Sequence, residues 1–145
     1  MKIVIGCDHA GYNIKNAVKK HIEEKGYEVV DVGTNSTDSC HYPVFASAAC
    51  KKILDGECEL GILICGTGVG ISLAANRVRG IRAVVCSEPY SAALSRQHNN
   101  TNILAFGARV IGIELAKLIV KSWLDTEFEG GRHLRRVQML DEIKP

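Results

Sequence analysis

A cysteine followed by a glycine-rich loop is the part of the sequence with the clearest chemical potential. The segment reads Cys65, Gly66, Thr67, Gly68, Val69 and Gly70, directly after an apolar run. Alternating glycines between a buried strand and a helix let backbone N–H groups converge on an anion. No Gly-Lys-Ser/Thr follows, and the glycine spacing differs from a dinucleotide fingerprint. The sequence therefore predicts an anion site here, with a plain strand-to-helix turn as the alternative.

Cys65 stands at the mouth of this loop, where N–H dipoles and a helix N-terminus favour a thiolate. A thiolate can remove a carbon-bound proton if the resulting enolate is stabilised. The neighbouring amides and the Thr67 hydroxyl offer that stabilisation, so base and anion hole would be adjacent in sequence. The alternative is an inert buried strand cysteine, a description that fits Cys7 and Cys86 equally well.

Six further polar residues occupy positions where chemistry or phosphate binding is often found. They are Asp8 and His9 after the first apolar run, His98 and Asn99 at a predicted helix end, and the i, i+4 pair Arg132 and Arg136. The arginine pair can hold a phosphate from one helix face. Each residue also has an ordinary interpretation as a satisfied histidine, a polar helix end or a solvated basic face.

Composition excludes several classes of protein. Of the 145 residues, 46% are hydrophobic and 23% charged, and the formal net charge is +2, which is too small to indicate a nucleic-acid or membrane partner. The six cysteines contain no CxxC pair, so reduced thiols in the cytoplasm are expected. Cys7, His9, Cys65 and His98 offer zinc-ligand atoms, but no closely spaced pair supports a metal site, and none is predicted.

The elements that must position these residues follow a βαβ order. Strands are predicted at residues 2–7, 27–32, 60–65, 81–86 and 102–106, with helices between them and a polar connection at 33–42 that is long enough to be functional. The expected fold is a single α/β domain over residues 1–145, a doubly wound Rossmann-like five-stranded parallel sheet with helices on both faces and a C-terminal helical tail. Ligands of such sheets bind beyond the carboxyl ends of the strands.

Six segments together resemble the family of sugar-phosphate isomerases that contains ribose-5-phosphate isomerase B and galactose-6-phosphate isomerase. The segments are residues 6–9, 64–72, 83–90, 95–99, 105–107 and 129–133. The resemblance covers the whole chain and implies interconversion of D-ribose 5-phosphate and D-ribulose 5-phosphate through a cis-enediolate, without metal or cofactor.

The resemblance also implies a role for each matching residue. Cys65 would be the base, with Thr67 and the amides of Gly66 to Gly70 holding the enediolate oxygens. His98 would open the furanose ring with help from Asp8, while Tyr42 and Asn99 line the sugar. The residues that would bind the phosphate are His9, Arg109, Arg132 and Arg136.

The family implies a homodimer or tetramer whose active sites draw residues from two subunits, although the sequence does not say which residues cross over. A cysteine base places the chain in one branch of the family, since another branch uses glutamate. Two alternatives stay open. One is an isomerase of a six-carbon sugar phosphate, such as allose 6-phosphate or galactose 6-phosphate, and the other is a non-catalytic phosphate-binding module.

Overall fold

Five short apolar runs form one parallel sheet in the computed structural model, which describes residues 1–144. The strands are β1 (Lys2–Cys7), β2 (Glu28–Gly33), β3 (Leu60–Cys65), β4 (Ala83–Val85) and β5 (Ile103–Gly107). β3 and β5 are buried along their whole length, because helices cover both faces of the sheet. The predicted five-stranded parallel sheet is confirmed.

The strand order is β2-β1-β3-β5-β4, so β5 is inserted between β3 and β4. β4 is shorter than the predicted strand at residues 81–86. Its outer edge is closed by Asn76, whose side-chain amide donates to the Ala83 carbonyl at 2.9 Å and accepts from the Ala83 N–H at 2.8 Å. A side chain thus satisfies backbone groups that would otherwise be open for further strand pairing.

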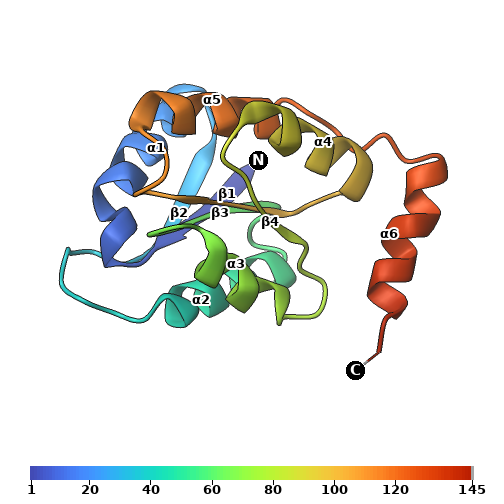
Figure 1. Cartoon of the computed structure of the whole chain (residues 1–145), viewed down its shortest axis with the longest axis horizontal. Helices are drawn as coiled ribbons and strands as arrows, with labels where there is room; N and C mark the ends of the chain where they lie inside the picture. The colour runs from blue at the N-terminus through green and yellow to red at the C-terminus, as the bar shows by residue number, and fades with distance from the viewer. Residues whose placement is uncertain (145) are drawn as a thin grey trace.

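Helices cover the sheet in two layers (Figure 1). One layer contains α1 (Tyr12–Glu24), α4 (Pro89–Asn99) and α5 (Ile113–Leu124), the other α2 (Tyr42–Leu54) and α3 (Val69–Asn76), and a short 3-10 turn, η1 (His9–Gly11), follows β1. The core of the first layer includes fully buried Trp123, whose indole N–H donates to Thr101 Oγ1 at 3.0 Å. Within residues 1–144, no helix is both long enough and apolar enough to span a bilayer.

The C-terminal helix α6 (Arg132–Glu142) stands beside the layered body, at the end away from the 34–41 connection (Figure 1). Its residues His133 and Val137 are buried, and Asp141 forms an ion pair with Arg82 at 3.5 Å. Leu134, Met139 and Leu140, in contrast, are about half exposed. The helix therefore keeps an apolar surface that this chain alone does not cover.

Candidate active site

Cys65 ends β3 at the centre of the sheet, where the carboxyl ends of three strands meet. It pairs in register with Gly107 of β5, and the Asp8 N–H after β1 donates to the Ile64 carbonyl at 3.1 Å. The Cys65 side chain is 4% exposed, and its Sγ accepts a hydrogen bond from the Gly68 N–H at 3.2 Å. An amide dipole aimed at sulfur favours a negative charge there.

The glycine loop lies directly against β5, and this close approach explains two of its glycines. A Cβ on Gly107 would lie 2.6 Å from the Cα of Thr67, and one on Gly68 would lie 2.7 Å from the carbonyl carbon of Phe106. Gly68 also has φ 82°, a left-handed conformation that glycine adopts without strain. The loop is therefore held in one conformation, with its amides at the edge of the sheet.

Thr67 is exposed and its hydroxyl is still able to donate. Its Oγ1 accepts the Val69 N–H at 3.2 Å, which leaves the hydroxyl proton for an incoming anion. The Gly68 amide is directed to sulfur, so the Thr67 hydroxyl is a separate donor that can bind an oxyanion.

Two other cysteines at strand ends have an environment that suits a neutral thiol. Burial raises the pKa of Cys7 and of Cys86 to about 11, and Glu88 adds to the shift at Cys86. Both therefore stay protonated at neutral pH. From the sequence, Cys7 and Cys86 were as good candidates for the base as Cys65. The hydrogen bond from the loop to the Cys65 sulfur distinguishes Cys65 from them.

Asp8 and His9 follow β1 at the same edge as Cys65. Asp8 is 6% exposed, and its Oδ1 accepts the Ala10 N–H at 3.0 Å, so it caps η1. The His9 Nδ1 accepts the Cys40 N–H at 3.3 Å. With Nδ1 engaged in this way, the other ring nitrogen, Nε2, is the one that can donate to a phosphate oxygen.

Tyr42 and Arg109 frame the loop on its two sides. A Cβ on Gly70 would lie 2.8 Å from the Tyr42 ring, and one on Gly66 would lie 3.3 Å from Nη1 of Arg109. In the described part of the chain, Arg109 forms no ion pair, which leaves its charge for an anionic ligand. We call Asp8, His9, Tyr42, Cys65 to Gly70 and Arg109 the Cys65 cluster.

A buried ion pair anchors the connection that leads to Tyr42. Lys15 is 1% exposed, and its Nζ donates to Asp31 Oδ1 at 3.0 Å and to the Thr34 carbonyl at 2.6 Å. A single ammonium thus joins the end of β2 to the first residue of the connection. Lys15 was not predicted as a site-positioning residue, because lysines on helices are ordinarily exposed.

The other predicted site residues gather between α4 and α6. His98, Asn99 and Arg136 line a cavity of about 290 Å³ together with His133, and Arg132 stands at the start of α6. We call His98, Asn99, Arg132 and Arg136 the His98 cluster. Neither of its arginines forms an ion pair within residues 1–144, in contrast to Arg135, which pairs with Glu142 at 2.8 Å.

The two clusters lie at opposite ends of the sheet. Helix α4 runs antiparallel to the strands, so its last turn, which contains His98, lies at the edge of the sheet where the strands begin. The chain leaves α4 and enters β5 at Ile103, which pairs with Gly61 of β3. From Gly61, β3 runs about 13 Å further before it reaches Cys65. One chain therefore brings together most of the predicted site residues in two groups but does not unite the groups.

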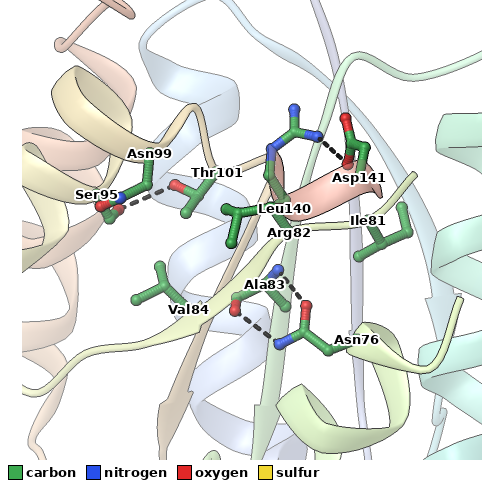
Figure 2. A pocket seen from close by; sticks show the side chains of 10 residues that line it. All are labelled: Asn76, Ile81, Arg82, Ala83, Val84, Ser95, Asn99, Thr101, Leu140 and Asp141. Atoms are coloured by element: carbon green, nitrogen blue, oxygen red, sulfur yellow. Dashed lines mark hydrogen bonds and ion pairs between the residues drawn. The ribbon is translucent and has the colours of Figure 1, made fainter. Parts of the chain in front are cut away.

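A cavity of about 370 Å³ also opens at this amino end (Figure 2). It is lined by Asn99, by the backbone and side chains around Arg82, and by Asp141 of α6, with the Arg82–Asp141 ion pair at its rim. No residue of the Cys65 cluster contributes to it. The amino end thus carries a hollow surface next to His98, bordered by α6.

His133 also belongs to this region, although no role was predicted for it. Its ring stacks on His98 with centroids 4.3 Å apart and an interplanar angle of 14°. Burial, followed by the charges of His98 and Arg132, lowers the pKa of His133. The signals in the sequence were its position beside Arg132 and its place in the segment 129–133.

Comparison with known proteins gives consistent matches over nearly the whole chain. The family described as Ribose/Galactose Isomerase matches residues 3–140. Ribose-5-phosphate isomerase B of Escherichia coli is 57% identical over 99% of this chain and 96% of its own length. The solved ribose-5-phosphate isomerase B of Clostridium thermocellum has a TM-score of 0.97 and 52% identity, covering 98% of this chain and 96% of that one. A structure from Mycoplasma genitalium with bound ribulose-5-phosphate has a TM-score of 0.93 and 40% identity, covering 97% and 94%.

Proposed function

This chain belongs to the ribose/galactose isomerase family, and on that basis we propose that it interconverts D-ribose 5-phosphate and D-ribulose 5-phosphate with Cys65 as the base. The observation that carries the proposal is the arrangement around one sulfur. Cys65 Sγ accepts the Gly68 N–H, and Thr67 of the same loop has a hydroxyl whose oxygen accepts the Val69 N–H, so that its proton is available to an anion. The same segment thus supplies both the base and the stabilisation of the anion that the base creates.

In the proposed reaction, the Cys65 thiolate removes the proton from C2 of the open-chain aldose. The electron pair moves into a C1–C2 double bond, and the carbonyl oxygen at C1 becomes the negative oxygen of a cis-enediolate. Thr67 and the loop amides donate hydrogen bonds to the enediolate oxygens. Cys65 then returns the proton to C1, while the hydroxyl proton of O2 passes to O1, which leaves the carbonyl at C2. Substrate and product have the same composition, and the scheme requires no cofactor.

The furanose ring must open first, and the proposal assigns that proton transfer to His98 with Asp8 near the ring oxygen. Tyr42 and Asn99 line the sugar. Four cationic or donor groups bind the phosphate: His9, Arg109, Arg132 and Arg136. Binding of the phosphate, which is remote from the reacting carbons, positions C1 and C2 at the sulfur. This positioning contributes to the rate enhancement.

The proposed site combines the Cys65 cluster of one copy with the His98 cluster of a second. Two features support this pairing. The clusters are far apart within a chain, and α6 carries half-exposed Leu134, Met139 and Leu140 beside its arginines. A two-fold dimer places the same surface patch on both partners and would form two equivalent sites. A tetramer could contain the same pair twice.

The direct test is a ketose-formation assay with ribose 5-phosphate, run beside allose 6-phosphate and galactose 6-phosphate. We expect the highest kcat/KM with ribose 5-phosphate. A higher value with a six-carbon substrate would move the assignment to that sugar. Phosphate-ester binding without any ketose formation would instead support a non-catalytic binding module.

A further inference from the structure

Three potential metal ligands converge where α4 ends and α6 begins. One ligand atom from each of His98, Glu129 and His133 lies within 4.8 Å of the other two. The Glu129 N–H donates to the Gln97 carbonyl at 3.0 Å, which ties the segment before α6 to the last turn of α4. The three side chains are thus held together by backbone structure and not by bonds among themselves.

These donor groups are not engaged elsewhere in the described residues 1–144. The imidazole of His98 and the carboxylate of Glu129 form no hydrogen bond or ion pair there. His133 is 5% exposed, and its Nε2 is buried without a partner. A buried polar atom without a hydrogen bond is unfavourable, and coordination is one way to satisfy a ring nitrogen.

The donor set has a definite chemical preference. Two imidazole nitrogens and one carboxylate oxygen suit Zn²⁺ and related first-row transition metals, and a His₂Glu set leaves a fourth position open for water. His98 lies in the last turn of α4, where the helix carbonyls attract a cation. The charges of Arg132 and Arg136 oppose the cation, and the Glu129 carboxylate offsets part of that repulsion.

Coordination requires a limited movement of side chains. Zinc–nitrogen bonds of about 2.0–2.1 Å require the ligand atoms, which lie within 4.8 Å of one another, to point at one common position. His98 is half-buried and Glu129 exposed, so both can rotate toward buried His133. The stacked arrangement of the two rings would be lost when the cation binds.

We propose that His98, Glu129 and His133 bind a divalent transition-metal cation of the Zn²⁺ type, and that the bound cation inhibits the enzyme. Inhibition follows because a coordinated His98 cannot exchange a proton with the sugar. The inhibitory part rests on the proposed function, whereas the binding part does not.

Equilibrium dialysis with ZnCl₂ tests the binding part. The intact protein should bind one Zn²⁺ per chain at this site, and Glu129→Gln and His133→Phe should each weaken binding by at least about tenfold. Glu127→Gln is the matched control, because it removes a nearby exposed carboxylate that is outside the cluster. Equal affinity in all four proteins would overturn the proposal.

Cobalt substitution separates this site from the thiols. Co²⁺ held by nitrogen and oxygen ligands gives visible d–d bands without the near-ultraviolet charge transfer of a thiolate. We expect those bands in the intact protein and in Cys65→Ala. A thiolate band that disappears in Cys65→Ala would place the metal at Cys65 and refute the proposal.

Activity tests the inhibitory part. Zn²⁺ should inhibit ketose formation by the intact protein, and Glu129→Gln should keep its metal-free rate while resisting inhibition at least about tenfold better. Equal inhibition of both proteins would remove the inhibitory part. A protein that binds Zn²⁺ as expected but forms no ketose even without metal would refute the proposed function and leave the metal site standing.

Discussion

Cys65 and His98 lie at opposite ends of the same sheet, the first at the carboxyl end of β3 and the second in the last turn of α4. A proton-transferring base and a ring-opening group must both reach one sugar. In the proposed enzyme they do so only across an interface between two copies. This relationship leads to the first prediction.

Mixed oligomers should recover activity that neither parent has. Cys65→Ala and His98→Ala are each expected to keep no more than about 1% of wild-type activity alone. After random reassociation, half of the dimers contain both variants, and each of these has one intact site, so about one quarter of wild-type activity should return. Activity is measured by ketose formation after mixed refolding. Failure to recover any activity, with heterodimers demonstrated by native mass spectrometry, would contradict a shared site.

Cys65→Ala should reduce isomerisation by roughly 10²–10⁴-fold, because it removes the base while the loop amides stay in place. Exchange of the C2 proton with deuterium from solvent should fall in parallel, and phosphate binding should be retained. Cys86→Ala is the control, since that buried thiol lies at the same edge of the sheet but outside the glycine loop. Full activity in Cys65→Ala would end the assignment of this residue.

His98→Ala should affect ring opening more than proton transfer. We expect a loss of about 10²-fold on ribose 5-phosphate and a smaller loss on an analogue that cannot cyclise. Steady-state kinetics with both substrates makes the comparison. Equal losses on the two would argue that His98 acts in another step.

Gly68→Ala should both unfold more easily and lose activity. The left-handed φ of 82° costs an alanine roughly 1–2 kcal/mol, and its Cβ would overlap the backbone of Phe106 at 2.7 Å. Gly112→Ala is the matched control, since its φ is −87° and an added Cβ meets nothing within 4 Å. Urea unfolding compares the two. Equal free energies of unfolding would show that the loop can relax around the added methyl.

Lys15→Met should lower the free energy of unfolding by about 2 kcal/mol, since it leaves the Thr34 carbonyl without its charged donor and Asp31 with Lys19 alone at 3.5 Å. Lys51→Met removes an ion pair whose partners are 74% and 54% exposed, and should cost about 0.5 kcal/mol or less. Urea unfolding again measures both. Similar losses in the free energy of unfolding for the two variants would mean that the buried pair stabilises the fold no more than an exposed one.

The sequence predicted those features that depend on local pattern. The bounds of β1 and β3 agree with the apolar runs predicted at residues 2–7 and 60–65. The strand order and the short β4 were not predicted, because they depend on packing between distant segments. The Asn76 side chain, for example, closes β4 from another element.

The candidate site was predicted residue by residue but not as an arrangement. Asp8 and the Cys65 segment were predicted to lie at the ligand-binding edge because they follow β1 and β3, and the carboxyl ends of parallel strands meet at one edge. A helix that returns from that edge must end at the other, and this rule would have placed His98 away from Cys65. The stacking of His133 on His98 was beyond the sequence, since it depends on the path of the segment before α6.

In the proposed dimer, helix α6 would make catalysis depend on protein concentration. If each copy contributes Arg132, Arg136 and His98 to the active site of its partner, a dissociated chain holds only half of an active site. Dilution would then abolish catalysis before any unfolding occurs. Specific activity would fall as the dimer dissociates.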